Sequence, residues 1–248
     1  MPEFTNRFLT MLGRSEKLRF AYTLFKLDVK KGKSKQLWHF ITHGIPWRKF
    51  VIKRYIKNQG LKKLQIGGGY HTKAGWLNGD LIAGDIYLNA AKKFPFPDAT
   101  FDVIFAEQFI EHLNLATGLF CLKECNRVLK HGGTIRLSTP DMKKLILFYS
   151  DENPEVDCET AMARHKRNHN PRLTTVCHFL NDFFRLWGHT FIYDEETLLL
   201  HLGSAGFTNI DRKRFDCSDN PHLQKLEIHA DVEWMKNAFQ LVLEAEKT

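Results

Sequence analysis

The chain has 248 residues, of which 43% are hydrophobic and 26% charged, so it is long and apolar enough to form a full hydrophobic core. Its five cysteines are scattered and include no CxxC pair, which excludes the usual zinc and redox dithiol motifs and favours a reducing compartment. The net charge of +8 is uneven, because residues 1–63 contain 16 lysines and arginines against three acids. We therefore expect a basic N-terminal segment followed by a mildly acidic domain.

Residues 1–58 show helix-like apolar spacing around a basic KKGKSK stretch, which predicts short helices and no catalytic motif. Charges interrupt every apolar run at the N-terminus, so we expect no signal peptide, no membrane span and a cytoplasmic protein. Two roles stay open for this segment. It is either a helical extension packed on the domain or a peripheral contact with an anionic membrane surface. Nucleic-acid binding is disfavoured because no recognisable module is present.

From Leu61 the sequence alternates between short strand-like runs and helical stretches, which predicts an α/β domain on a mainly parallel sheet. The predicted strands are LKKLQI, WLNGDLI, IYLNA, FDVIFAE and GGTIRLSTP. An amphipathic helix is expected from Leu115 to Leu129, with its end in NRVLKHGG. Near the C-terminus, we expect a helix capped by Asp194 and closed at Gly206, and then a strand in FTNIDRKRF.

A glycine turn follows the first predicted strand in LQIGGGYHTKAGWLNGD. Gly67 and Gly69 lack Cβ atoms and adopt positive φ readily, so the backbone there can approach a ligand beyond the carboxyl end of the strand. Asp80 follows only 11 residues after Gly69, which leaves no room for the crossover helix of a nicotinamide dinucleotide site. A carboxylate at this position suits a ligand with a ribose diol and no phosphate. A flexible turn with a surface acid is the competing interpretation.

Five stretches in order resemble the successive motifs of class I S-adenosylmethionine-dependent methyltransferases. They are LQIGGG, GWLNGD, FPFPDATFDVIFAEQFIEHL, ECNRVLKHGGTIRLSTPD and WGHTFIYDEETLLLHLGSAGF. They look most like the type 11-like subgroup in which GWLN followed by an acid replaces the usual first helix and second strand. The resemblance implies a Rossmann-like doubly wound, mainly parallel sheet over residues 59–248, preceded by the basic helical extension of residues 1–58.

The resemblance also implies a binding site for the cofactor S-adenosylmethionine. Its residues would be Gly67, Gly69, Asp80, Asn89, Ala90 and Gln108. The two glycines would flank the methionine part of the cofactor, Asp80 would bind the ribose hydroxyls, and the Asn89 and Ala90 pair would hold the adenine. Gln108 and the preceding Glu107 close the fourth strand, where the methyl donor and the acceptor would meet.

Methyl transfer from a sulfonium needs an aligned acceptor and, for a hydroxyl acceptor, a base that removes its proton. The candidate catalytic bases are His189 in WGHTF, His112 in FIEHL and Glu107. We expect no metal site. The stretch ARHKRNHNPRL has two histidines at helical spacing, but its four lysines and arginines would repel a cation. We interpret it as a basic lid for an anionic acceptor or as a solvated loop.

The sequence thus predicts an enzyme that transfers a methyl group to an oxygen or nitrogen of a small-molecule or glycan acceptor. By association with the resembling subgroup, a sugar hydroxyl in cell-surface polysaccharide biosynthesis is the leading acceptor. The alternative is a non-catalytic, degenerate cofactor domain with a basic membrane- or partner-binding arm. Gln65 and Asn89 favour this alternative, because the family has an acid or asparagine at the first position and an acid at the second. A nicotinamide enzyme ranks third.

Overall fold

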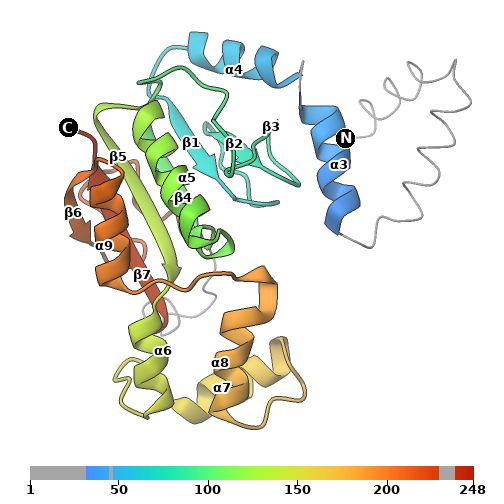
Figure 1. The fold of residues 1–248 in the computed structure, drawn as a ribbon, viewed down its shortest axis with the longest axis vertical. Helices are drawn as coiled ribbons and strands as arrows, with labels where there is room; N and C mark the ends of the chain where they lie inside the picture. Colours follow the sequence, from blue (N-terminus) through green and yellow to red (C-terminus); the bar gives the residue numbers. More distant parts are fainter. Residues whose placement is uncertain (1–31, 45–46, 229–237) are drawn as a thin grey trace, which may run out of the picture.

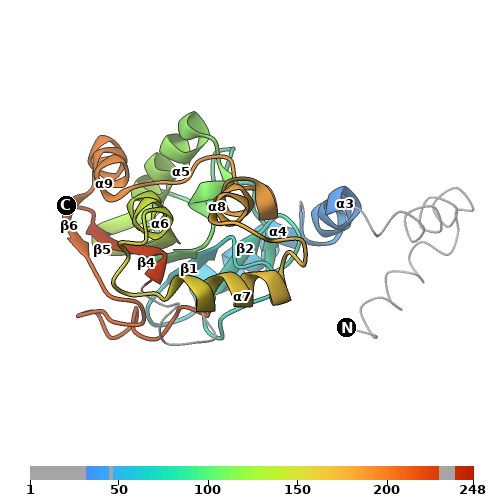
Figure 2. The same cartoon turned by 90° about the horizontal axis from the view of Figure 1, so that it is seen from below.

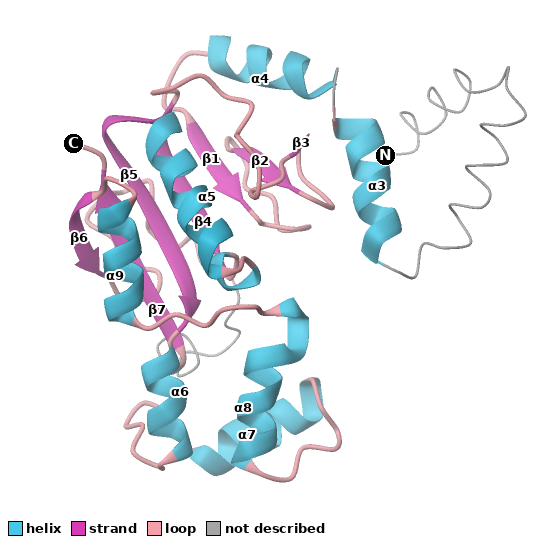
Figure 3. Cartoon of the chain, viewed as in Figure 1, coloured by secondary structure: helices cyan, strands magenta, loops and turns pink. Residues whose placement is uncertain are grey.

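The computed structural model describes residues 32–44, 47–228 and 238–248, in which one seven-stranded sheet carries the fold (Figures 1 and 3). The strands are β1 Lys63–Ile66, β2 Leu77–Asp80, β3 Ile86–Tyr87, β4 Phe101–Glu107, β5 Leu129–Pro140, β6 Thr208–Arg212 and β7 Gln240–Glu246. The α-helices are α3 Gly32–His43, α4 Trp47–Lys57, α5 Leu115–Val128, α6 Met142–Tyr149, α7 Cys158–Asn168, α8 Val176–Arg185 and α9 Glu195–Ser204. Two short 3₁₀ helices, η1 Ile110–His112 and η2 Leu186–Gly188, complete the described elements.

The strand order is β3-β2-β1-β4-β5-β7-β6, with β1 at the point where the order reverses. Strands β1 to β5 pair in parallel, whereas β7 runs antiparallel to both β5 and β6. This confirms the predicted Rossmann-like, mainly parallel sheet. In such sheets ligands bind beyond the carboxyl ends of the strands next to the reversal point, which here are the ends of β1 and β4.

One face of the sheet is covered by α5 and α9, which pack against each other and against the apolar side chains of the strands (Figure 1). Cys121 and Cys125 of α5 are both buried in this layer. The caps of both helices are also as expected from their sequences. Asn114 accepts a hydrogen bond from the Thr117 amide, and Asp194 accepts one from the Thr197 amide.

The opposite face is covered by residues 213–228, a segment with no helix or strand. At its centre lies the fully buried guanidinium of Arg136 on β5. Arg136 donates through Nε to Glu227 Oε1 at 2.5 Å and through an Nη to Glu244 Oε1 at 2.6 Å. It also donates to the backbone carbonyls of Cys217 and Arg214. Because the buried charge has two carboxylates and two carbonyls as partners, it fastens this irregular segment to the sheet.

The structure departs from the sequence prediction at the start of β5 and in the chain that follows it. Strand β7 and helix α6 were not predicted, and NRVLKHGG does not end in a glycine-terminated helix. Helix α5 already stops at Val128, and the chain enters β5 at Leu129, which pairs with Phe101. Burial of Leu129 against β4 therefore overrides the helical pattern of the stretch.

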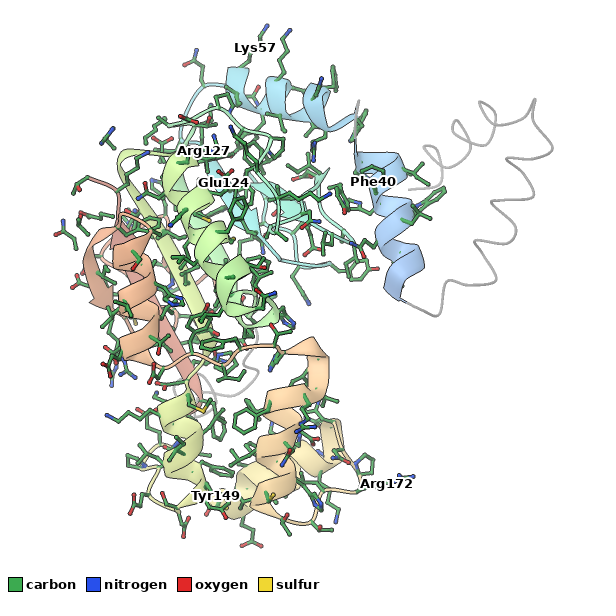
Figure 4. The ribbon with its side chains drawn as sticks, viewed as in Figure 1. Phe40, Lys57, Glu124, Arg127, Tyr149 and Arg172 are labelled. Carbon is green, nitrogen blue, oxygen red and sulfur yellow. The ribbon has the colours of Figure 1, made fainter. Side chains whose placement is uncertain are left out.

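The helices α6, α7 and α8, with η2, form a helical lobe of residues 142–188 beyond the carboxyl ends of the parallel strands (Figures 1 and 2). The lobe has its own core of aromatic and aliphatic side chains, which includes Phe148 and Phe179. Tyr149 and Arg172 lie at its outer end, away from the sheet (Figure 4). The lobe thus stands as a cover over the edge of the sheet at which a ligand is expected.

The described part of the basic N-terminal segment consists of α3 and α4, and the residues before Gly32 lie outside the described part of the chain. Helix α4 contributes Ile52 to the core of the sheet, and the Tyr55 hydroxyl donates to the Lys63 carbonyl at 2.9 Å. Helix α3 packs against β3, where Phe40 makes an edge contact with Tyr87. Among the described residues, none of the helices is long and apolar enough to cross a bilayer.

Candidate active site

Each of the three glycines after β1 lies in a different local environment. Gly67 has φ +71°, and a Cβ there would come within 2.1 Å of the Phe109 ring. At Gly68, a Cβ would lie 2.3 Å from the side-chain nitrogen of Gln65. Gly69 has φ +53° and nothing within 4 Å of the Cβ position, so it faces open space. The turn is therefore tightly packed underneath and open at Gly69, the geometry that a close ligand requires.

Gln65 stabilises this turn from inside β1. It is buried, and its Nε2 donates to the His71 carbonyl at 3.0 Å, which ties the strand to the loop beyond the glycines. Its Oε1 has no hydrogen-bond partner among the described residues. An amide at this position thus supplies the donor that holds the loop.

Asp80 ends β2 and reaches across to the glycine turn. Its Oδ2 accepts from the Gly69 amide at 3.0 Å, and its Oδ1 accepts from the Ile82 amide at 2.7 Å. Each oxygen keeps a further lone pair, because a carboxylate has about four acceptor positions. The chain between Ile66 and Leu77 contains no helix, which agrees with the short spacing in the sequence. The fold therefore places the predicted glycine turn and Asp80 in direct contact.

The two residues expected at the adenine lie after β3. Asn89 Oδ1 accepts from the Ala91 amide at 2.9 Å, which closes a local turn, and Ala90 is buried in the core. On the other side of Asp80, the buried His39 of α3 lies near the carboxylate. Burial lowers the pKa of His39, and Asp80 opposes this shift through its charge. Helix α3 consequently borders the ribose end of the predicted site.

Gln108 follows β4 in a left-handed conformation, with φ +47°. Its amide donates to the Ser138 carbonyl at 2.8 Å, and its side-chain Nε2 donates to Gln240 Oε1 at 2.5 Å. A non-glycine residue held at positive φ carries backbone strain, which is concentrated at functional sites. Gln108 thus marks the point where the sheet meets the helical lobe.

A cavity of about 320 Å³, here called the lobe cavity, lies between Gln108 and the helical lobe. The aromatic rings of Phe179, Phe183, Trp187 and Phe239 line it, as do the imidazoles of His112 and His189. Trp187 and Gly188 both have positive φ, +61° and +84°, and this sharp turn directs the chain to His189. The lobe cavity therefore combines flat apolar walls with two titratable groups, the usual make-up of a small-molecule site.

His112 and His189 form a close pair, with ring centroids 5.0 Å apart in an edge-on arrangement. Burial lowers the pKa of both imidazoles, and the neighbouring His189 lowers that of His112 further. His189 Nδ1 lies 2.5 Å from the Phe183 carbonyl, which accepts only, so Nδ1 carries the proton in the neutral ring. The unprotonated ring nitrogen of His189 is therefore Nε2. Both rings are neutral and able to accept a proton near pH 7.

Glu107, the third predicted base, lies elsewhere. Its carboxylate is buried and accepts from the Ile228 amide at 2.8 Å, and it does not line the lobe cavity. The basic stretch forms the end of α7 and the loop that follows, where Arg164, His165 and His169 line the cavity. His165 is buried and its Nε2 donates to Asp182 at 2.9 Å, so it is a fixed part of the lobe.

The aromatic lining was not recognised in the sequence, although a signal was present. Phe179, Phe183 and Trp187 are four residues apart in succession, a spacing that predicts one face of a helix, although only the first two lie on α8. Phe239 and Gln240 had no comparable signal, because they reach the cavity only through the antiparallel pairing of β7 with β5.

Comparisons with known proteins find one family match and several similar structures. The family model described as a methyltransferase domain matches residues 72–137. A search of curated proteins finds no match. A SAM-dependent methyltransferase structure from Thermotoga maritima is 16% identical, with 81% of this chain and 93% of that chain covered and a TM-score of 0.43. One from Archaeoglobus fulgidus is 17% identical, with coverages of 91% and 99% and a TM-score of 0.45.

A third similar structure is phosphoethanolamine N-methyltransferase 2 from Haemonchus contortus in complex with S-adenosyl-L-methionine. It is 13% identical, with 86% of this chain and 56% of that chain covered and a TM-score of 0.44. Because all three TM-scores are below 0.5, the assignment depends on the family match and on the strand order of the sheet itself. On those two observations, residues 72–137 match a methyltransferase domain and lie in a Rossmann-like, mainly parallel sheet.

Proposed function

We propose that the protein binds S-adenosylmethionine at the glycine turn and transfers its methyl group to an oxygen or nitrogen of an acceptor in the lobe cavity. The observation that carries this proposal is the position of Gln108, which joins the strand end expected at the methyl donor to the wall of the cavity. A donor at the strand end and an acceptor in the cavity would be held in line, and alignment is the main requirement of the displacement.

For the cofactor we propose the roles implied by the family resemblance. Gly69 leaves open space for the methionine part, and the remaining lone pairs of Asp80 accept from the two ribose hydroxyls. Asn89 and Ala90 border the adenine, where Asn89 can still offer its side-chain amide. Gly67 keeps the turn packed against Phe109 beneath the ligand.

For a hydroxyl acceptor we propose that His189 removes the proton as methyl transfer proceeds. Its Nε2 is the free acceptor atom of a neutral ring, and the ring lines the cavity. His112 is the second candidate, because it lines the same cavity at contact distance from His189. Glu107 stays the weakest of the three, since its carboxylate is directed to the backbone of Ile228.

The acceptor class we propose is a small molecule or glycan with a ring that stacks on the aromatic walls, such as a sugar of a nucleotide- or lipid-linked glycan in polysaccharide biosynthesis. Sugar rings and other flat bodies pack well against Trp and Phe faces. Arg164 at the cavity wall supports an anionic group on that acceptor, as a diphosphate linkage would provide.

We also propose that residues 1–58 form a unit that attaches the methyltransferase domain of residues 59–248 to an anionic membrane surface, at the cytoplasmic side. The described helices support this. Leu37, Phe40, Ile41 and Phe50 are exposed large apolar side chains, and most basic side chains of α4, such as Lys49 and Lys53, are exposed as well. Lys57 projects from the end of α4 (Figure 4). Exposed apolar and basic side chains together are the features of interfacial helices.

Turnover of the purified protein tests the proposed function. S-adenosylhomocysteine release should require an acceptor and should be strongest with nucleotide- or lipid-linked sugars. The variant His189→Ala should lower the rate while leaving cofactor affinity unchanged, and His178→Ala, on the exposed surface of α8, is the matched control. If the cofactor binds but no acceptor supports turnover, the alternative of a non-catalytic cofactor domain replaces the proposal.

The membrane proposal has its own test. Full-length protein should sediment with anionic vesicles at low salt, and a chain starting at residue 59 should stay in the supernatant. Equal sedimentation of both chains would contradict the proposed role of residues 1–58.

A further inference from the structure

Two histidines that line the lobe cavity, His112 and His189, form a cluster of three metal-ligating groups with the buried Glu111. Glu111 and His112 come from η1, and His189 comes from the end of the helical lobe. One ligand atom of each residue lies within 4.8 Å of those of the other two. The fold therefore collects two imidazoles and a carboxylate from segments far apart in the sequence.

The two segments that carry the cluster are fastened to each other through the backbone. The carbonyl of Glu111 accepts from the amides of Thr190 and Phe191 at 2.8 and 3.1 Å. The Thr190 hydroxyl donates to the same carbonyl at 3.3 Å. Because these bonds lie directly beside His189, they hold its position relative to η1. A ligand set needs this kind of support to bind an ion selectively.

The outer hydrogen bonds of the cluster are those that metal ligands usually have. His189 donates its Nδ1 proton to the Phe183 carbonyl at 2.5 Å, which leaves Nε2 as the ligating atom. The carboxylate of Glu111, which is fully buried, accepts from the Thr139 hydroxyl at 3.0 Å. Both ligands are thus oriented by groups that do not themselves bind the ion.

The donor set determines the class of ion. Two histidines and one glutamate are the protein ligands of many catalytic zinc sites, and the same set with open positions also binds Fe²⁺. Zn²⁺ ligands at about 2.1 Å in a tetrahedron lie roughly 3.4 Å apart, so the three groups would have to close by no more than about 1.4 Å. Arg164 lines the same cavity, and the negative charge of Glu111 offsets its repulsion of a cation.

We propose that Glu111, His112 and His189 form a mononuclear site for a divalent transition metal, with Zn²⁺ as the best-matched ion and the open coordination position directed to the lobe cavity. This proposal differs from the expectation from the sequence that the chain has no metal site. Its role in methyl transfer rests on the proposed function. In the loaded protein the metal would bind the acceptor hydroxyl and lower its pKa, and His189 would act as a ligand in place of a base.

Metal binding tests the site without any assumption about activity. Full-length protein is treated with chelator, dialysed and titrated with ZnCl₂ by calorimetry, and the bound zinc is counted by elemental analysis. The expected result is one zinc per chain. Glu111→Gln and His189→Ala should each weaken the affinity at least tenfold, since even the loss of an outer-shell partner costs 10- to 100-fold. The control His178→Ala should bind as the wild type does.

A spectroscopic measurement keeps the proposal testable if one variant fails to fold. Co²⁺ added to the wild type should give the intense visible bands of a four-coordinate site, and His112→Ala should abolish them. Saturating Zn²⁺ should also raise the thermal midpoint of the wild type and not that of His112→Ala. The proposal is overturned if the wild type binds no zinc, or if binding is lost in His169→Ala and kept in His189→Ala. Zinc binding without methyl transfer would leave the site standing and refute only the proposed function.

Discussion

Alanine substitutions at two positions of the glycine turn should rank in opposite order for their effects on stability and on cofactor affinity. Gly67 and Gly69 both have positive φ, so alanine costs about 1–2 kcal/mol of backbone strain at either position. At Gly67 the added Cβ also meets the Phe109 ring at 2.1 Å, and overpacking of this kind costs about 1–3 kcal/mol more. Gly67→Ala should therefore lower the free energy of unfolding by roughly 2–5 kcal/mol, and Gly69→Ala by only about 1–2 kcal/mol.

Affinity for S-adenosylhomocysteine should follow the reverse order, because the space beside Gly69 is the space that the methionine part of the ligand would fill. Gly69→Ala should weaken binding at least tenfold, about 1.4 kcal/mol, in a protein that remains folded at 25 °C. Urea unfolding gives the stability of each variant, and calorimetric titration gives its affinity. The double variant Gly67→Ala/Phe109→Ala should recover part of the stability lost at Gly67, since it removes the clash. Wild-type affinity in Gly69→Ala would refute the position of the ligand at the turn.

Three further predictions concern the acid, the buried arginine and the histidine pair. Asp80→Ala should weaken S-adenosylhomocysteine binding by about 3–6 kcal/mol, because it removes two hydrogen bonds to a charged group and each contributes about 1.5–3 kcal/mol, and Asp85→Ala is the calorimetric control. Arg136→Met should cost about 3–5 kcal/mol in urea unfolding, since it leaves two carboxylates buried without their cation. Burial raises the pKa of Glu227 above its unfolded value. The loss of unfolding free energy in Arg136→Met should therefore shrink as the pH falls through the raised pKa, because the protonated carboxyl no longer needs a cation. An equal loss at pH 5 and pH 8 would contradict this explanation. In the metal-free protein, proton removal from a hydroxyl acceptor needs a neutral imidazole. Because burial lowers the pKa of His189 below its ordinary 6.5, the acid limb of the pH–rate profile should lie below 6.5 and vanish in His189→Ala.

The parallel half of the sheet could be predicted from the sequence because its strands are short, apolar and bounded by turn residues. Leu64, Ile66 and Ile104 are buried, as their positions in LKKLQI and FDVIFAE indicated. Strand β7 could not be predicted in the same way. Its burial depends on antiparallel pairing with β5, more than a hundred residues earlier, and on Glu244, whose burial requires Arg136 as its partner. Long-range charge pairing leaves no periodic signal in a single sequence.

The candidate site was partly predictable for a similar reason. Gly69 and Asp80 are close in sequence, and the structure joins them with a hydrogen bond between the Gly69 amide and the carboxylate. His112 and His189 were proposed separately as bases, and only the fold shows that they are neighbours. Glu107 illustrates the limit of motif reasoning, because its place at the end of β4 says nothing about the direction of its carboxylate, which accepts from Ile228.

Calorimetric titration of the full-length protein with S-adenosylhomocysteine tests the central claim most directly, with NAD as the control ligand and Asp80→Ala measured in parallel. We predict saturable binding of one S-adenosylhomocysteine per chain, a large loss of affinity in Asp80→Ala and no binding of NAD. Absence of S-adenosylhomocysteine binding to the folded wild type, or equal binding by Asp80→Ala, would contradict the assignment of the glycine turn and its acid as the cofactor site.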